Sequence, residues 1–512
     1  MNFKNLFRIA ALVGMPCLLV HAQTAEQDTL SHLNKINQQY NNERDFKTNY
    51  FYNPAAMSDY SSSSFTSVQI GYTADDNKSY RQILGQKHNS YGLTTKSYQK
   101  VSENMSIWGK ASYSSNQIKG MQWNENLDAE RVFPYVISDS VRADLAIEKY
   151  HFLGGFAQKI NRFTIGLEGE YAAQMGSRSR DPRNKTITSD LLLKFGINYH
   201  IHKAFEVGAY IQGEKYTQNN HIRFASLLGY PILYQMTSFG NYNYMFSGGS
   251  SDTKTLFEQF GYEYGGYISN RDAKDFYVLF RQGNSNLVKS TDGIYSSQYD
   301  IADVQDKFTI IEGGKFFGND RQRYGLKLQY GFKQRLGSEY GYSNNTSVLE
   351  QIYKQLSYRR QVYNYRADII YQLSTSHISL GFMPFMDYEE YDERRLRPIS
   401  GQKWKSLTLG ISADLKAELS KQNIITFQPY FSRKTVNQKD YLFDTNSNAG
   451  INEWVFNEYN FLSSDVTTLG ATLRYDIKMN KIPGLFVSFN WENNQILKQN
   501  NNYTSLQLGV IF

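Results

Sequence analysis

The last ten residues place the strongest constraint on the fold of this chain. From Tyr503 to Phe512, apolar and polar side chains alternate, and the sequence ends on an aromatic residue. In an extended strand this alternation puts Leu506, Leu508 and Val510 on one face and small or polar residues on the other. One face suits lipid or a core, and the other suits water. The pattern predicts a half-buried terminal strand, either at the edge of a soluble sandwich or in a membrane barrel.

The first 22 residues predict a cleaved signal peptide. Lys4 and Arg8 precede an apolar run over residues 9–20, which is too short to span a bilayer, and Ala22 offers a small residue for cleavage. Cys17, the only cysteine, would leave with this leader. The mature chain would then contain no thiol, which excludes disulfides and thiol catalysis.

Composition favours a β-barrel over a helical membrane protein. After the leader, no segment has the run of about twenty apolar residues that a membrane helix needs. The chain instead carries 41 Tyr, 32 Phe and 37 Gly against 9 Pro, which suits the aromatic girdles of an outer-membrane barrel. A soluble sandwich or propeller would share this composition. The net charge of +7 comes without basic clusters, and we expect no nucleic-acid partner.

Period-two alternation recurs along residues 65–512. Between Tyr324 and Phe332, for example, Leu326 and Leu328 alternate with Lys327 and other polar or small residues. Tight gaps and long polar gaps follow one another in strict order, the pattern of short periplasmic turns and long extracellular loops. We therefore predict an all-β, up-and-down antiparallel transmembrane barrel of about eighteen strands, beginning near Phe65, with fourteen or sixteen strands left open.

The polar gaps are expected to be extracellular loops. One of them contains an acidic run over residues 387–393 followed by Arg394 and Arg395, which we interpret as a solvated loop whose charges pair among themselves. The expected loops cover roughly residues 74–103, 126–149, 173–188, 215–256, 285–305, 334–360, 389–403, 433–464 and 493–502.

Residues 23–64 are predicted to form a short helical and coil segment ahead of the barrel. Leu30, Leu33 and Ile36 have helical spacing, and Asn53-Pro54 is a turn signal. A barrel of this size is too wide to be filled by its own side chains. We expect the segment to be either a plug in the lumen or a loose periplasmic tail.

These features together resemble an uncharacterised family of Gram-negative outer-membrane β-barrel proteins of unknown function. The resemblance rests on the leader, the gap alternation, the terminal strand and the element Tyr50-Phe-Tyr-Asn53-Pro54-Ala55. The terminal aromatic residue Phe512 resembles the signal that the barrel-assembly machinery recognises. Asn53, Pro54 and Ala55 also resemble the hatch motif of long-chain fatty-acid transporters, which precedes a fourteen-stranded barrel. Such a transporter needs an apolar interior, whereas the polar faces here carry charges such as Glu168, Asp414 and Arg474.

No residue pattern predicts an enzyme. His200 and His202 have a spacing that suits a metal, but no third ligand accompanies them at close spacing. We expect no catalytic residue, no bound metal and no cofactor.

The sequence favours a cell outer-membrane barrel acting as a channel or partly plugged pore for small solutes. A non-conducting surface barrel that contacts other envelope components through its loops is the alternative, and a fatty-acid-type transporter is the second alternative. Outer-membrane lipids, lipopolysaccharide and the assembly machinery are the expected partners.

Overall fold

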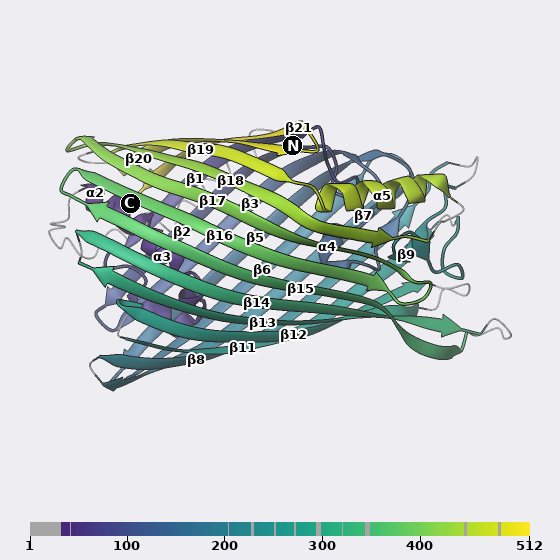
Figure 1. Cartoon of the computed structure of the whole chain (residues 1–512), viewed down its shortest axis with the longest axis horizontal. Helices are drawn as coiled ribbons and strands as arrows, with labels where there is room; N and C mark the ends of the chain where they lie inside the picture. Colours follow the sequence, from purple (N-terminus) through teal and green to yellow (C-terminus); the bar gives the residue numbers. More distant parts are fainter. Residues whose placement is uncertain are drawn as a thin grey trace.

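The computed structural model describes residues 32–512 apart from 41, 203, 227–229, 250–251, 271–272, 293–297, 320, 344–348, 445–447 and 480–482. Within this part of the chain, eighteen antiparallel strands close into one barrel (Figure 1). β1 (Phe65–Asn77) pairs with β2 (Lys87–Ser102) and also with β21 (Gln499–Ile511), which closes the sheet. The predicted fold class and the count of about eighteen strands are confirmed, whereas fourteen and sixteen are wrong.

Sequential strands pair as neighbours all around the barrel. The remaining barrel strands are β3 (Met105–Met121), β5 (Ala143–Ile160), β6 (Phe163–Arg178), β7 (Arg183–His202), β8 (Phe205–Arg223), β11 (Asp252–Asn270), β12 (Phe276–Asp292), β13 (Gln298–Gly318), β14 (Gln322–Tyr342), β15 (Gln351–Ser374), β16 (Ile378–Arg395), β17 (Ser400–Ser420), β18 (Asn423–Leu442), β19 (Val466–Ile477) and β20 (Gly484–Ile496).

The lengths of the connections between strands distinguish the two ends of the barrel. Connections such as 103–104, 161–162 and 421–422 lie at one end, here called the short-turn end. The connections 122–142 and 224–251 lie at the other, called the long-loop end. In outer-membrane barrels the short turns face the periplasm, and we orient the molecule accordingly.

Most of the expected long loops are wrong, because the strands continue through them. β2 occupies most of the expected loop 74–103, and the actual gaps over 173–188 and 389–403 shrink to 179–182 and 396–399. The acidic run over 387–393 lies inside β16 and not in a loop. The physical reason is that strands project beyond the lipid, where both faces meet water and apolar alternation is lost although the backbone ladder continues.

Three long connections remain at the long-loop end and carry their own structure. Residues 122–142 contain α4 (Ala129–Val132) and β4 (Ile137–Ser138), which pairs with β9 in the connection 224–251. The third connection, 443–465, contains α5. The connection 224–251 contains β9 (Tyr234–Ser238) and β10 (Asn241–Tyr242), and α5 spans Ala449–Leu462.

The chain before β1 forms short helices at the opposite end. Figure 1 shows α2 and α3 near one end of the barrel and α5 and β9 near the other. Among the described residues, no helix combines the length and apolar character needed to cross a bilayer. The expected signal peptide, residues 1–22, lies outside the described residues. The elements before β1 are α2 (His32–Gln39), α3 (Asn42–Phe46), and the 3-10 turns η2 (Tyr50–Tyr52) and η3 (Pro54–Asp59).

Candidate functional site: two segments inside the lumen

The barrel presents apolar side chains outward and polar side chains inward. On β14, Leu326 and Leu328 are exposed on the outer face, while Lys327 between them donates a hydrogen bond to the Phe46 carbonyl inside the barrel. On β6, Leu167 is exposed outward and Glu168 is buried inward, where it pairs with Lys194 at 2.7 Å. Because the inner face carries paired charges, the lumen is polar.

Residues 32–60 lie against this inner face and are called here the N-terminal lumen segment. Its helix α2 turns Leu33 and Ile36 onto Ile424 of β18, and all three side chains are buried. Leu33 and Ile36 belong to the helical stripe expected from the sequence, whose third member, Leu30, lies outside the described residues. The apolar contact anchors the beginning of the described chain to the wall near the short-turn end.

Polar contacts then fix the segment to three strands of one part of the wall, β14, β17 and β19. The Arg474 guanidinium of β19 donates to the Tyr40 hydroxyl at 2.8 Å, and the Asn42 amide donates to the Asp414 carboxylate at 2.8 Å. Arg323 of β14 donates to Glu43 at 3.0 Å. Asp414 and Arg474, which were predicted to face the lumen, therefore bind the segment, as does Arg323. Hydrogen bonds to charged groups contribute about 1.5–3 kcal/mol each when desolvated.

Tyr52 contacts side chains of β7, β8 and β12. Its ring lies between two cations, with Lys194 and Arg281 each 3.7 Å from the ring centroid. Its hydroxyl donates to Gln212 of β8 at 2.6 Å. A tyrosine ring held between two cations is a well-defined contact, since each cation is attracted to the negative face of the ring. Burial and nearby Glu263 raise the pKa of Tyr52, so it stays protonated.

The element Asn53-Pro54-Ala55 sits in a close-fitting seat on the wall. The Asn53 side-chain oxygen accepts from the Ala55 backbone N–H at 2.9 Å and so caps η3, while its amide donates to Asn198 at 2.9 Å. Gly166 of β6 and Gly196 of β7 lie side by side in the ladder beneath this element. A side chain at either glycine would collide with it: a Cβ at Gly166 would lie 2.6 Å from the Pro54 carbonyl oxygen.

Residues 122–142 enter the lumen from the long-loop end and are called here the outer lumen segment. Asp128 accepts from the Tyr216 hydroxyl at 2.8 Å. Arg131 lies 3.9 Å above the Tyr216 ring and binds Asp190 at 2.7 Å, and it also pairs with Glu214. These contacts hold α4 against β7 and β8.

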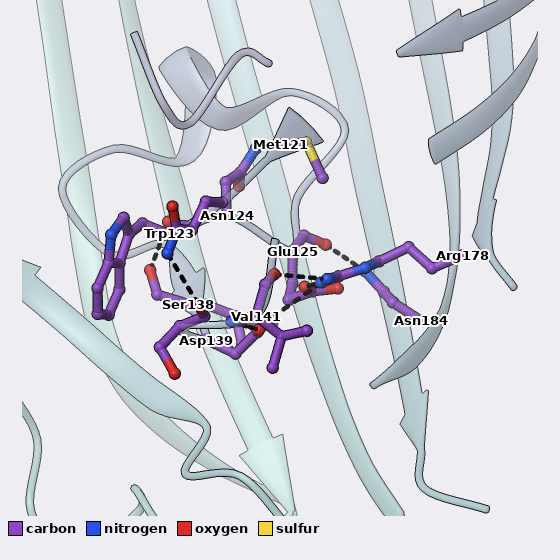
Figure 2. A network of polar contacts seen from close by, with 12 residues as sticks. Met121, Trp123, Asn124, Glu125, Ser138, Asp139, Val141, Arg178 and Asn184 are labelled. Atoms are coloured by element: carbon purple, nitrogen blue, oxygen red, sulfur yellow. Dashed lines mark hydrogen bonds and ion pairs between the residues drawn. The ribbon is translucent and has the colours of Figure 1, made fainter. Parts of the chain in front are cut away.

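A buried charge cluster anchors the two ends of the outer lumen segment, as Figure 2 shows. Arg178, the last residue of β6, pairs with Glu125 and also with Asp139 at 2.8 Å, and all three side chains are almost fully buried. Asn184 donates to the Glu125 carbonyl. One guanidinium faces two carboxylates, so only one negative charge is neutralised. Burial raises the pKa of Asp139 to about 7.

An apolar core packs above the outer lumen segment. Trp123 stacks on Trp454 of α5 with the ring centroids 5.8 Å apart, and Val136 and Ile137 are fully enclosed beside Tyr234 of β9. Sequence reasoning missed this segment as part of the lumen and treated most of it as loop. Its run of apolar and aromatic residues, which a solvated loop does not need, was the available signal.

The two segments approach each other along β8. Tyr52 of the N-terminal lumen segment binds Gln212, and Arg131 of the outer lumen segment binds Glu214, the next inward-facing residue. Successive inward residues on a strand are separated by about 6.7 Å. On this side of the lumen, therefore, little space separates the segments.

Phe512 lies at the seam of the barrel near the short-turn end. Its backbone N–H donates to the Thr66 carbonyl at 2.9 Å, and its carbonyl accepts from the Thr66 N–H at 3.4 Å. The ring is partly exposed. Among the described residues, no group of three or more His, Cys, Asp or Glu side chains is arranged to hold a metal ion.

Comparison with solved structures finds large receptor barrels at low similarity. BauA, the ferric preacinetobactin receptor from Acinetobacter baumannii, gives a TM-score of 0.39 at 8% identity over 88% of this chain and 80% of that chain. The ferric yersiniabactin uptake receptor FyuA from Yersinia pestis gives 0.39 at 9% identity over 88% and 80%. Similarities with TM-scores this low support no conclusion about function.

A comparison with curated proteins gives no match. The model of a family of unknown function, DUF6850, matches residues 54–512, beginning inside the N-terminal lumen segment. The expected membership of an uncharacterised barrel family is thereby confirmed, and the protein, an outer-membrane-type β-barrel, belongs to the DUF6850 family.

Proposed function

We propose that the protein is a gated outer-membrane pore for small polar solutes, held closed by two plugs in series. The N-terminal lumen segment acts as the plug on the periplasmic side, with Asn53, Pro54 and Ala55 as its hatch element. The outer lumen segment acts as the plug on the extracellular side. The observation that carries the proposal is that both segments bind the polar lumen wall from opposite ends and meet at neighbouring residues of β8.

The chemistry of the wall supports a polar solute. One row of directly paired inward residues crosses β19, β20, β21, β1, β2 and β3 and consists only of hydroxyl and amide side chains. Most of them are partly exposed to solvent. A wall of this kind suits water and neutral polar solutes and argues against a fatty-acid-type transporter, which needs an apolar interior. The row is Thr472, Asn490, Ser505, Thr73, Ser90 and Asn116.

A non-conducting surface barrel remains the second candidate, and one observation favours it. Trp123, Val136 and Ile137 of the outer lumen segment belong to a buried apolar core shared with α5 and β9. Displacing large buried apolar side chains costs about 1.5–3 kcal/mol each. A segment held in this way would serve as a fixed part of the surface and would not open.

Conductance in planar bilayers distinguishes the two candidates, with four forms of the full-length protein. The first is unaltered, the second lacks residues 24–60, which include Tyr52 and the hatch element, the third has residues 122–142 replaced by a Gly/Ser linker, and the fourth carries both changes. Two plugs in series each limit the current. We therefore expect a small increase in conductance from either change alone and a large increase from both changes together.

A deletion of residues 24–31, which spares the described contacts of the N-terminal lumen segment, is the matched control and should conduct like the unaltered protein. Heat-modifiable migration on gels checks that each form is an assembled barrel. If the doubly altered barrel assembles and conducts no better than the unaltered one, the pore proposal is wrong and the surface-barrel candidate stands.

A further inference from the structure

Three exposed lysines face the lumen from neighbouring strands, Lys96 of β2, Lys110 of β3 and Lys149 of β5. Lys110 lies two residues from Trp108, and Lys149 lies two residues from His151; both neighbours contact inward glutamates of β6. Lys96 is directly opposite Lys110 in the ladder and therefore shares its face. These three residues are called here the lumen lysines. Since inward side chains stay exposed only beside solvent-filled space, the lumen is not filled on this side.

The lumen lysines lack the acidic partners that other inward cations have. On β7, for example, Lys194 pairs with Glu168 at 2.7 Å. Within the described residues, no acidic side chain lies within ion-pair distance of a lumen lysine. Asp45 of α3 attracts Lys96 only from beyond that distance. Like charges directly opposite each other, as Lys96 and Lys110 are, destabilise a sheet, and an anion between them would remove the repulsion.

The lumen lysines extend from one lumen segment to the other. At the periplasmic side, the Lys96 Nζ atom lies 5.9 Å from the ring centroid of Tyr60, which belongs to the N-terminal lumen segment. At the other side, the next inward residue of β5 beyond Lys149 is Ile147, which is buried in an apolar cluster with Leu127 of the outer lumen segment. The unpaired positive charge therefore lines the wall between the two segments.

Hydroxyl groups fill the wall between the lysines. Lys149 is directly opposite Ser114, which follows Lys110 by four residues on β3, a distance of about 13 Å along the strand. Ser112 lies between them on the same face, and both serines are partly exposed. Asn116, a member of the hydroxyl and amide row described above, continues this face toward the long-loop end. This stretch of β3 thus offers hydrogen-bond donors beside the cations and no negative charge.

We propose that the lumen lysines make the lumen selective for anions, so that the solute carries carboxylate or phosphate groups. The inference rests on the proposed pore function and adds the charge class of its solute. Lysine ammonium groups are strongly hydrated point charges on flexible stems, and Lys and Arg side chains lining a pore select anions. Conduction requires several sites that each hold the ion weakly. The Lys96–Lys110 pair and Lys149 provide two such sites in sequence along the wall.

Lysine acetylation in the unaltered full-length protein tests the anion site, with citrate as the anionic probe and glucose as the neutral probe. Mass spectrometry measures the acetylation rate of each lysine at constant ionic strength. With citrate at about ten times its apparent Kd, acetylation of Lys96 and Lys110 should slow about tenfold. Lys185 and Lys254, which lie beside His221 on the outer face, are the matched controls and should react at unchanged rates. Absence of citrate protection, or equal protection by glucose, would overturn the proposal.

Reversal potentials in a potassium chloride gradient test selectivity in the doubly altered barrel. Chloride should permeate more readily than potassium. A unit charge about 4 Å from an ion in water changes its partition about fivefold, so loss of the lumen lysines should lower the chloride-to-potassium ratio at least about fivefold. The control variant removes the same charge from the outer face and should keep the ratio. The substitutions are Lys96→Gln, Lys110→Gln and Lys149→Gln in the test variant, and Lys185→Gln, Lys215→Gln and Lys254→Gln in the control variant.

The two experiments separate this inference from the proposed function. A doubly altered barrel that conducts with equal ratios in the test and control variants overturns anion selectivity and leaves the pore proposal standing. A doubly altered barrel that does not conduct contradicts the pore, and citrate protection then decides whether the lumen lysines bind anions. Heat-modifiable migration checks assembly. The single variant Lys110→Gln, which breaks no ion pair among the described residues, replaces the threefold variant if the latter fails to assemble.

Discussion

The seat of the hatch element offers a direct test of how the N-terminal lumen segment is held. Gly196 lies beneath Asn53 and Pro54, and a Cβ at this position would lie 2.9 Å from the Pro54 Cδ atom and would collide with the Asn53 side-chain oxygen. Backbone and proline ring atoms at this distance have to move. Gly196→Ala should therefore lift the hatch element off the wall.

The size of the effect follows from the contacts that are lost. Overpacking costs about 1–3 kcal/mol, and loss of the Asn53 hydrogen bond to Asn198 costs about 1 kcal/mol. The docked state should be destabilised by about 2–4 kcal/mol, because the contacts are lost together. At about 1.4 kcal/mol per factor of ten, the undocked population rises between about thirtyfold and several hundredfold.

Hydrogen exchange measures this population directly, because exchange of a protected amide tracks local opening. The Ala55 and Ala56 amides are bonded within the element, to the Asn53 side chain and the Asn53 carbonyl. Their exchange should accelerate by the factor given above. Gly213→Ala on β8 is the matched control, since a Cβ there meets no atom within 4 Å. The reasoning is refuted if Gly196→Ala assembles and its exchange at these two amides matches that of Gly213→Ala.

Three further outcomes are expected. The pKa of Asp139 is raised to about 7 from the ordinary value of 3.8, so its contribution to stability is fully present below pH about 4 and is lost as pH rises through 7. Protease cleavage within residues 122–142 should therefore accelerate between pH 6 and pH 8. The variant Asp139→Asn should show a smaller increase in cleavage over this pH range. Arg131→Met leaves Asp190 and Glu214 together without their cation, and we expect about 2–3 kcal/mol of destabilisation of the outer lumen segment. Hydrogen exchange in α4 should become faster with no change in η3, and equal exchange in α4 of the variant and the unaltered protein would contradict the prediction. Deleting Phe512 removes the last backbone pair of the seam with Thr66, and the fraction of heat-modifiable barrel in the membrane should fall, whereas unchanged assembly would mean that the terminal residue carries no signal.

The membrane-spanning part of the fold could be predicted from the sequence because lipid and lumen demand opposite side chains on successive residues. The alternation around Leu326 and Leu328 lies in β14 as expected, and the first strand starts at Phe65. Above the lipid this demand disappears. Glu390 and Lys405 are charged and outward, yet they lie opposite each other in a regular ladder. A polar run therefore cannot be assigned to loop or strand by its composition alone.

Only those contacts of the site that form between residues close in sequence could be predicted. The turn at Asn53-Pro54 is encoded by neighbouring residues, since the Asn53 side chain caps the amide two positions later. Its seat depends on Gly166 and Gly196, which come together only through the pairing of β6 with β7. Likewise Arg178 meets Asp139 through the path of a whole connection. Contacts of this kind depend on register, which no single stretch of sequence contains.

The seam between β1 and β21 sets the order of events during assembly. Every other pair of adjacent strands is joined by a connection of one chain segment, but Ser67 and Ile511 come from opposite ends of the barrel sequence. Until the last strand arrives, both edges carry unpaired backbone groups that lipid does not tolerate. The N-terminal lumen segment is joined to β1, one strand of the seam, by residues 61–64. Closure of the seam therefore also encloses the segment, and we expect the segment to be seated on the wall before the last strand pairs with β1.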